Sequence, residues 1–317
     1  RHTRSFHVTE FRRVLFRSGG KGKSIANLVS MEEGERIAAM IAVKEFDAGR
    51  FVVMGTRGGV IKKTELTAFS NPRAGGIIAM GVDDGDAVIA AQISEGMNEV
   101  FLGTRDGMAI RFSEDDVRPM GRTAFGVRGI SLREGDAVVA MEVLKPGGTI
   151  LSVTEQGYGK RTGLDEYRLQ TRGGIGIINI QTSDRNGRVV GITQVTDDDE
   201  LMLITQQGKI LRMASKDIRS IGRATQGVRL IEIEGEDRAV SIARLAESED
   251  GVVDYGGRVP VNVRRVLAGS MFLVLALSVA ASMARAADEA PTLPSYFTAR
   301  SEEHTSELQS RETISYA

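Results

Sequence analysis

Residues 150–161, ILSVTEQGYGKR, decide the fold of this chain. They form an apolar run, then a four-residue turn ending in glycine, then a run that contains the adjacent cations Lys160 and Arg161. An apolar run that enters a glycine turn and leaves as a second short run predicts a β-hairpin. The Thr-x-x-Gly turn occurs at 56–59, 104–107, 154–157 and 205–208.

Successive turns are 48, 50 and 51 residues apart, so the middle of the chain is a repeat. Each turn follows an apolar run, at 51–54, 100–102, 150–153 and 201–204. Each is followed by a strand with a cation, at 60–63, 108–111, 158–161 and 209–212. A second glycine cluster then leads into another strand, and a closing strand is expected near 86–90, 136–140, 188–192 and 238–242.

About four short strands per unit of this length are typical of a propeller blade, because radial repetition leaves only short sheet edges exposed. We therefore predict an all-β, propeller-like fold. It would have about four blades plus part of another, since residues 25–43 look like the closing half of an earlier blade.

Composition agrees with this fold and excludes several functions. The 317 residues include 37 glycines and six prolines, which suits many tight turns, and no cysteine, which removes disulfides and thiolate metal sites. All three histidines lie near the ends, at positions 2, 7 and 304. The middle of the chain therefore has no histidine for acid–base catalysis, Ser-His triads or the usual zinc sites.

The two ends are expected to lie outside the fold. Residues 11–18 and 300–310 resemble translations of sequencing-adapter DNA read on opposite strands, so we interpret 1–18 and 300–317 as adapter-derived. Residues 263–299 have a basic start, a short apolar run and a small-x-small site, as in a secretory signal peptide, and are attributed to another gene; a tail anchor is the alternative. Residues 251–262 would be the junction, and 19–250 the domain.

Four motifs resemble the C-terminal domain of the bacterial gyrase A protein. They are 25–28 (IANL) with 32–37 (EEGERI), 121–129 (GRTAFGVRG), 157–162 (GYGKRT) and 222–228 (GRATQGV). The resemblance extends over about residues 19–249. It implies a β-pinwheel, truncated here from six blades, whose basic rim bends duplex DNA.

The resemblance also implies what surrounds such a domain. It implies no catalytic activity, metal or cofactor in this part of the chain, with ATP and Mg²⁺ needed only by the full enzyme, a cytoplasmic type II topoisomerase that introduces negative supercoils. The implied partners are double-stranded DNA, the gyrase B protein and the N-terminal part of the gyrase A protein in an A2B2 assembly, with no membrane. Relative to that family, the chain lacks the breakage-reunion domain, about one blade and the seven-residue gyrase box, which residues 19–23 (GGKGK) only echo.

Attraction to DNA would depend on where the charges lie, because the formal net charge is −1 and residues 50–245 hold 26 Lys and Arg against 26 Asp and Glu. Cations that follow turns or flank glycines recur at equivalent positions and are the expected phosphate contacts. They are Lys62, Lys63, Arg73, Arg111, Arg122, Arg128, Lys160, Arg161, Arg172, Arg212, Arg223 and Arg229.

Other readings of these motifs are weaker. The glycine clusters lack the strand-loop-helix context and the downstream Lys-Ser/Thr of a nucleotide loop, so they predict turns rather than an ATP site. Tyr158 and Tyr167 are not expected to be nucleophiles, and the aspartate runs are interpreted as solvated turns rather than Mg²⁺ ligands. Two rival functions stay open: the equivalent C-terminal domain of topoisomerase IV, and a propeller that serves only as a protein-interaction platform.

Overall fold

The computed structural model describes residues 36–73 and 76–245, and in this part of the chain every helix is a single 3₁₀ turn. The strands are β1 (Phe51–Thr56), β2 (Val60–Glu65), β3 (Val88–Ser94), β4 (Glu99–Thr104), β5 (Met108–Ser113), β6 (Val127–Arg128), β7 (Val138–Leu144), β8 (Thr149–Thr154), β9 (Tyr158–Gly163), β10 (Ile177–Ile178), β11 (Val189–Val195), β12 (Glu200–Thr205), β13 (Ile210–Ala214), β14 (Val228–Arg229) and β15 (Ala239–Leu245). The turns are η2 (Leu66–Phe69), η3 (Glu114–Asp116), η4 (Leu164–Glu166) and η5 (Ser215–Asp217). The all-β prediction is confirmed.

The strands form four small antiparallel sheets, one for each repeat. Their orders are β3-β1-β2-β6, β10-β5-β4-β7, β11-β8-β9-β14 and β13-β12-β15. The outermost strand of each of the first three sheets comes from the following repeat: Val60 and Ile61 of β2, for example, pair with Arg128 and Val127 of β6. Sequence predicted four strands per blade, and the structure adds that adjacent blades exchange the fourth.

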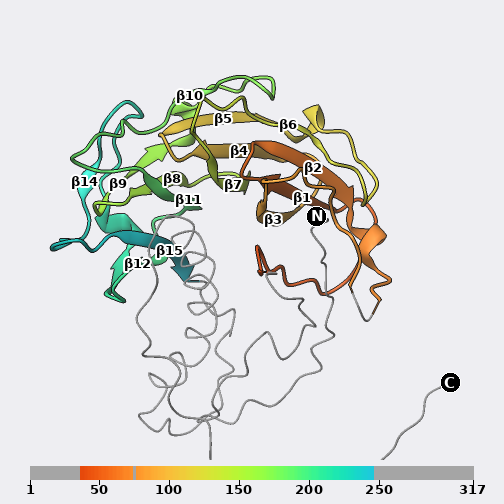
Figure 1. Ribbon diagram of the computed structural model, residues 1–317, viewed down its shortest axis with the longest axis horizontal. Coiled ribbons are helices and arrows are strands. Elements are labelled where there is room, and N and C mark those ends of the chain that lie inside the picture. The colour runs from red at the N-terminus through yellow and green to blue at the C-terminus, as the bar shows by residue number, and fades with distance from the viewer. Residues whose placement is uncertain (1–35, 74–75, 246–317) are drawn as a thin grey trace, which may run out of the picture.

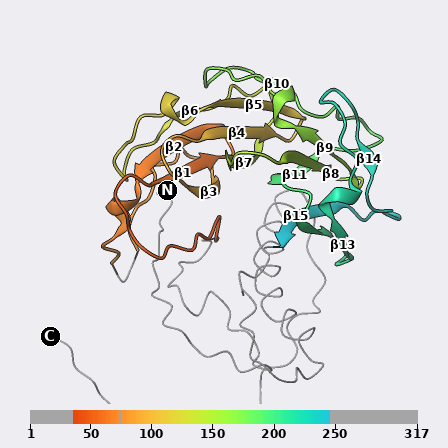
Figure 2. The same ribbon diagram turned by 180° about the vertical axis from the view of Figure 1, so that it is seen from behind.

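The sheets stand side by side in a curved row (Figure 1). Strands β3, β7, β11 and β15 lie on the concave side and contact one another in sequence, while β6, β10 and β14 lie on the convex side (Figures 1 and 2). The convex side is called the outer rim below. Each repeat therefore contributes one innermost strand and sends one short strand to the rim of the sheet before it.

The core lies between successive sheets. Strands such as β4 and β5, whose sheet has a neighbouring sheet on either side, are therefore buried on both faces. Leu102 and Ile110 of the second sheet pack against Val53 and Ile61 of the first. Phe101, the neighbour of Leu102 in the chain, points the other way and packs with residues of the third sheet. Burial on both faces explains why these strands read as continuous apolar runs rather than as alternating ones.

The hairpin glycines are fixed by backbone conformation and by the neighbouring repeat. Gly107 has φ of 87°, which favours glycine, and a Cβ added there would lie 2.1 Å from the carbonyl oxygen of Ile180. The threonine of the turn stabilises the hairpin, because Thr104 Oγ1 accepts a hydrogen bond from the backbone N–H of Met108 at 3.1 Å. The repeated Thr-x-x-Gly pattern is therefore explained by turn geometry.

The Gly107→Ala variant should lower the free energy of unfolding by about 2–3 kcal/mol, because it adds positive-φ strain and displaces the backbone of the next repeat at Ile180. Urea denaturation measures this loss. Gly135→Ala is the matched control: its φ is also positive, at 74°, but no heavy atom lies within 4 Å of the added Cβ. Equal losses in the two variants would show that the close contact with Ile180 contributes nothing.

Residues 25–43 are described only from position 36, and the described part contains no strand. Ile41 and Val43 instead pack against the free face of the first sheet, with Phe46. Residues 36–43 therefore do not form the closing strand expected of an earlier blade, and residues 25–35 lie outside the described residues. No helix within residues 36–73 and 76–245 is long and apolar enough to cross a membrane. The segments 1–18, 251–262, 263–299 and 300–317 lie outside the described residues.

Candidate nucleic-acid interface

One group of cations occupies the same position in every hairpin: Lys63, Arg111, Arg161 and Arg212. In the first three sheets this side chain crosses to the next repeat and donates to carbonyl oxygens at its 3₁₀ turn. Arg111 donates to Leu164 O at 2.6 Å and to Tyr167 O at 2.9 Å, and Arg161 donates to Ile218 O at 2.9 Å. The side chains of Lys63, Arg111 and Arg161 therefore link adjacent blades, and they are called staples below.

Lys63 is the most enclosed of these staples. Its ammonium lies 3.3 Å from Glu114 Oε1, and the two side chains are 5% and 1% exposed. The Glu114 carboxylate also accepts hydrogen bonds from Ser94 Oγ at 2.6 Å and from the backbone N–H of Asn98 at 3.1 Å. Lys63 therefore neutralises a buried carboxylate and has no route to a DNA phosphate in this conformation.

The two lysines at the preceding position, Lys62 and Lys160, are fully buried. Lys160 Nζ donates to Gly222 O at 2.7 Å and to Arg223 O, and Lys62 Nζ donates to Ala79 O at 2.8 Å and to Arg122 O. Each ammonium thus binds the loop of the next repeat that carries Arg122 or Arg223. The prediction of direct phosphate contact is replaced by a positioning role for Lys62 and Lys160, and by the staple role for Lys63, Arg111 and Arg161.

Burial, and after it the nearby Arg223 guanidinium, lowers the pKa of Lys160 to about 7. The unfolded chain would hold this proton up to the ordinary lysine pKa of about 10.4. Between these two values the unfolded state binds more protons than the folded state, so stability should rise with pH, by at most about 1.4 kcal/mol per unit from this group.

The Lys160→Met variant should lose that part of the pH dependence. Urea denaturation at about pH 7, about pH 8 and about pH 9 would measure it, and the wild-type curve should rise more steeply than that of the variant. Lys145→Met removes an exposed lysine and should leave the slope unchanged. Parallel curves for the wild type and Lys160→Met would contradict a depressed pKa at Lys160.

The remaining predicted arginines differ in position. Arg128 in β6 and Arg229 in β14 occupy equivalent positions on outermost strands and are exposed. Arg73 is exposed, whereas Arg122 is half-buried. Arg212 is 56% exposed and pairs with Glu200 on its own hairpin, in the one described sheet that has three strands.

Three of the predicted arginines hydrogen-bond to the preceding repeat. Arg122 donates to Ile78 O at 3.3 Å, Arg172 to Arg128 O at 2.9 Å and Arg223 to Ile178 O at 2.9 Å. Each guanidinium is thus held at the boundary between neighbouring outer segments. The loops and short strands of the convex side carry five predicted arginines, which are called the rim arginines below: Arg122, Arg128, Arg172, Arg223 and Arg229.

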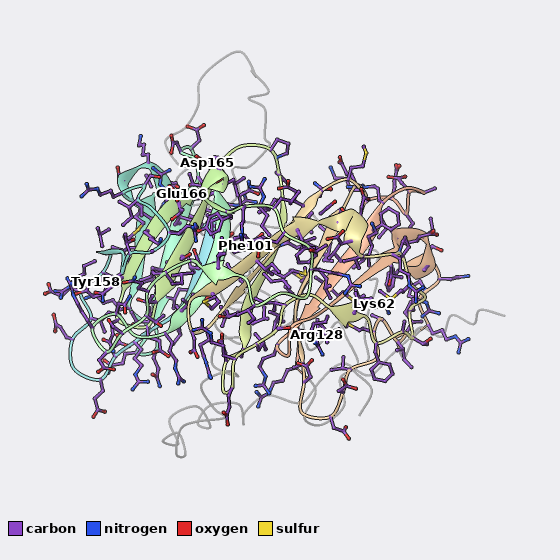
Figure 3. The ribbon with its side chains drawn as sticks, turned by 90° about the horizontal axis from the view of Figure 1, so that it is seen from above. Lys62, Phe101, Arg128, Tyr158, Asp165 and Glu166 are labelled. Atoms are coloured by element: carbon purple, nitrogen blue, oxygen red, sulfur yellow. The ribbon has the colours of Figure 1, made fainter. Side chains whose placement is uncertain are left out.

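Two of the 3₁₀ turns, η3 and η4, are acidic. Glu114, Asp115 and Asp116 make up η3, and Asp165 and Glu166 lie in η4. A view onto the rim shows Asp165 and Glu166 toward one edge and Arg128 toward the other (Figure 3). These acidic turns also contact two of the arginines on the outer segments: Arg223 lies 3.9 Å from Glu166, and Arg172 donates to Asp116 O at 2.9 Å. Within residues 36–73 and 76–245 no group of three or more carboxylate or histidine side chains could hold a metal ion.

Tyr158 and Tyr167 differ sharply in their surroundings. The Tyr167 hydroxyl donates to Asn179 Oδ1 at 2.6 Å, and burial raises the pKa of this phenol. Tyr158 is the first residue of β9 and is also buried, at 5% exposure, and its hydroxyl accepts hydrogen bonds from Arg229 at 3.2 Å and Arg185 at 3.3 Å. Hydrogen bonds first from Arg229 and then from Arg185 lower the pKa of Tyr158. Sequence reasoning considered Tyr158 only as a nucleophile and missed Arg185.

These features define a class of protein: a β-pinwheel of strand-exchanging blades with cations along its convex side. The profile of the family described as "DNA gyrase C-terminal domain, beta-propeller" matches residues 6–44, 50–95, 98–145, 148–196 and 199–246. The chain belongs to this family. The first matched segment includes residues 6–18, which we interpreted as adapter-derived.

Curated relatives agree. The DNA gyrase A protein of Salmonella typhimurium strain LT2 is 46% identical over 232 residues, covering 73% of this chain and 26% of the relative, and that of Chlamydia muridarum is 44% identical over 246 residues, covering 76% and 30%. The chain thus spans about a quarter to a third of the length of these relatives.

Two solved structures share the fold. The C-terminal domain of DNA topoisomerase IV matches with a TM-score of 0.67 and 29% identity, covering 71% of this chain and 70% of that one. A DNA gyrase A C-terminal domain matches with a TM-score of 0.65 and 28% identity, covering 71% and 76%.

Proposed function

We propose that this chain binds duplex DNA along its outer rim and bends it around the convex side. The observation that carries this proposal is the placement of Arg122, Arg128, Arg172, Arg223 and Arg229 on successive outer segments of a curved row of blades. Arginine and lysine side chains that neutralise phosphates release condensed counterions, which gives strong binding without base readout. DNA stiffness opposes bending, so several contacts spread along the curve are needed to offset it.

Within the whole protein, we propose that this domain belongs to the gyrase A protein. The bound DNA would be led back to the cleavage core formed by the rest of gyrase A, and the gyrase B protein would hydrolyse ATP in an A2B2 assembly. Negative supercoiling would be the outcome, in the cytoplasm. The sequence identity to gyrase A proteins favours this assignment over topoisomerase IV, whose C-terminal domain has a similar fold.

Salt dependence of DNA binding tests the proposal. The affinity of the full chain for a mixed-sequence duplex, measured by fluorescence anisotropy, should fall steeply as salt rises, with a log–log slope of about −4 to −5 for five phosphate contacts. Duplexes of different sequence should bind with similar affinity. Absence of salt-dependent binding would favour the rival function, a platform for protein partners.

A further inference from the structure

We propose that Tyr158, Arg185 and Arg229 form a phosphodiester-binding site that anchors the DNA at one fixed point on the rim. This inference rests on the proposed function, because it assigns a particular phosphate contact within it. Tyr158, labelled in Figure 3, is the first residue of β9, and its register partner is Arg229 of β14, the exchanged outermost strand of the same sheet. Arg185 comes from the loop before β11.

The two guanidiniums converge on one aromatic ring. Their central carbons lie 5.1 Å (Arg185) and 5.5 Å (Arg229) from the Tyr158 ring centroid, within the range of cation–π attraction. Both also donate to the phenol oxygen. The ring therefore holds two like charges close together, an arrangement that a shared anion would stabilise.

The Arg229 cation is only weakly neutralised by the protein. Arg229 lies 3.6 Å from Glu232, and both side chains of this pair are mostly exposed, at 57% and 74%. An exposed ion pair of this kind contributes little and exchanges readily. A phosphodiester can instead accept hydrogen bonds from both guanidiniums at once, which is the geometry arginine favours.

One buried side chain holds both arginine-bearing segments in place. Asn186 is fully buried, and its Nδ2 donates to Gln181 O at 2.8 Å in its own loop and to Gln226 O at 3.1 Å in the segment that leads to β14. Its Oδ1 accepts from the backbone N–H of Ser183 at 2.8 Å. The site is thus preorganised, so little conformational entropy is lost when an anion binds.

The site occurs once in the part of the chain that the structure describes. At the position of Tyr158 the other hairpins carry Val60, Met108 and Lys209, none of which is aromatic. The loop that bears Arg185 is also longer, since 12 positions separate the starts of β10 and β11 and 11 separate the starts of β6 and β7. A contact made at one blade would set the register of the DNA on the rim, which a repeated contact cannot do.

The chemistry favours a backbone phosphate over an unpaired base. A base would need a free aromatic face for stacking, whereas guanidiniums already lie against the Tyr158 ring. The ligand class is therefore a phosphodiester of duplex DNA.

The test compares DNA affinities of full-chain variants by anisotropy with one labelled mixed-sequence duplex. Arg185→Gln and Arg229→Gln should each bind roughly fivefold to tenfold more weakly than the wild type. The double variant should lose less than the product of the two single losses, because both side chains hold one phosphate. Its log–log salt slope should be shallower by about one.

Arg133→Gln is the matched control, since Arg133 is an exposed arginine in the corresponding loop of the preceding repeat. It should bind within about twofold of the wild type, and thermal melts should show that all four variants fold. Losses at Arg185 and Arg229 no greater than at Arg133, or fully multiplicative losses, would overturn the shared phosphate site while leaving the proposed function intact. Failure of the wild-type chain to bind DNA would overturn the proposed function as well.

Discussion

The Lys63→Met variant should lower the free energy of unfolding by about 3–5 kcal/mol, because it leaves a charged carboxylate buried without its partner. Glu114 is fully buried, and the Lys63 ammonium at 3.3 Å is the one cation that pairs with it among the described residues. Ser94 and Asn98 continue to donate hydrogen bonds to the carboxylate but supply no charge. Urea or thermal denaturation measures the loss.

Arg212→Met is the matched control for this variant. Arg212 occupies the same hairpin position in the last described sheet, but it is 56% exposed and its Glu200 partner is 44% exposed. Loss of this surface pair should cost less than about 1 kcal/mol. Adding Glu114→Gln to Lys63→Met should recover part of the lost stability, because it removes the buried charge. Equal costs for Lys63→Met and Arg212→Met would contradict the staple role of Lys63.

Replacing all five rim arginines by glutamine should weaken DNA binding by about a hundredfold to a thousandfold at low salt and make the log–log salt slope shallower by about four to five. Glutamine retains an N–H donor, so the hydrogen bonds of Arg122, Arg172 and Arg223 to neighbouring carbonyls can be partly replaced. Anisotropy over a range of salt concentrations measures both quantities. Circular dichroism would show that the five-residue variant keeps its β-structure.

The control for the rim variant makes the same change in net charge away from the outermost strands. It replaces Arg57, Arg105, Arg133, Arg188 and Arg238 by glutamine. None of these arginines lies on β6, on β14 or in the loops that lead to β6, β10 and β14, so DNA affinity should change by less than about tenfold. Similar losses in the control and the rim variant would mean that overall charge, rather than its placement on the rim, determines binding.

The blades could be predicted from the sequence because each hairpin carries its own local signal. The positive φ of Gly59, Gly107, Gly157 and Gly208 fixes each turn, and the apolar runs on either side fix the strands. Strand exchange could not be predicted in the same way. The pairing of β6 with β2 joins segments more than sixty positions apart, and nothing local distinguishes a strand that stays in its own blade from one that joins its neighbour.

The candidate site was only partly predictable, because the sequence alone does not show whether a lysine or arginine side chain is buried. Lys62 and Lys160 were assigned to the DNA surface, yet the positions equivalent to them hold Ile110 and Leu211. Apolar residues at those equivalent positions were a signal that the position faces the core. No comparable signal exists for Arg185, whose contact with Tyr158 depends on the three-dimensional path of a loop.

Ligation of a nicked plasmid in the presence of the chain is the most direct test of DNA wrapping on the outer rim. DNA that is bent around the protein when the nick is sealed retains the change in writhe as supercoils after the protein is removed. We expect topoisomers shifted in one direction, in proportion to the amount of bound chain, and no shift with the rim variant. DNA binding by the wild-type chain without any topoisomer shift would contradict wrapping, because the DNA would then contact the rim without following its curve.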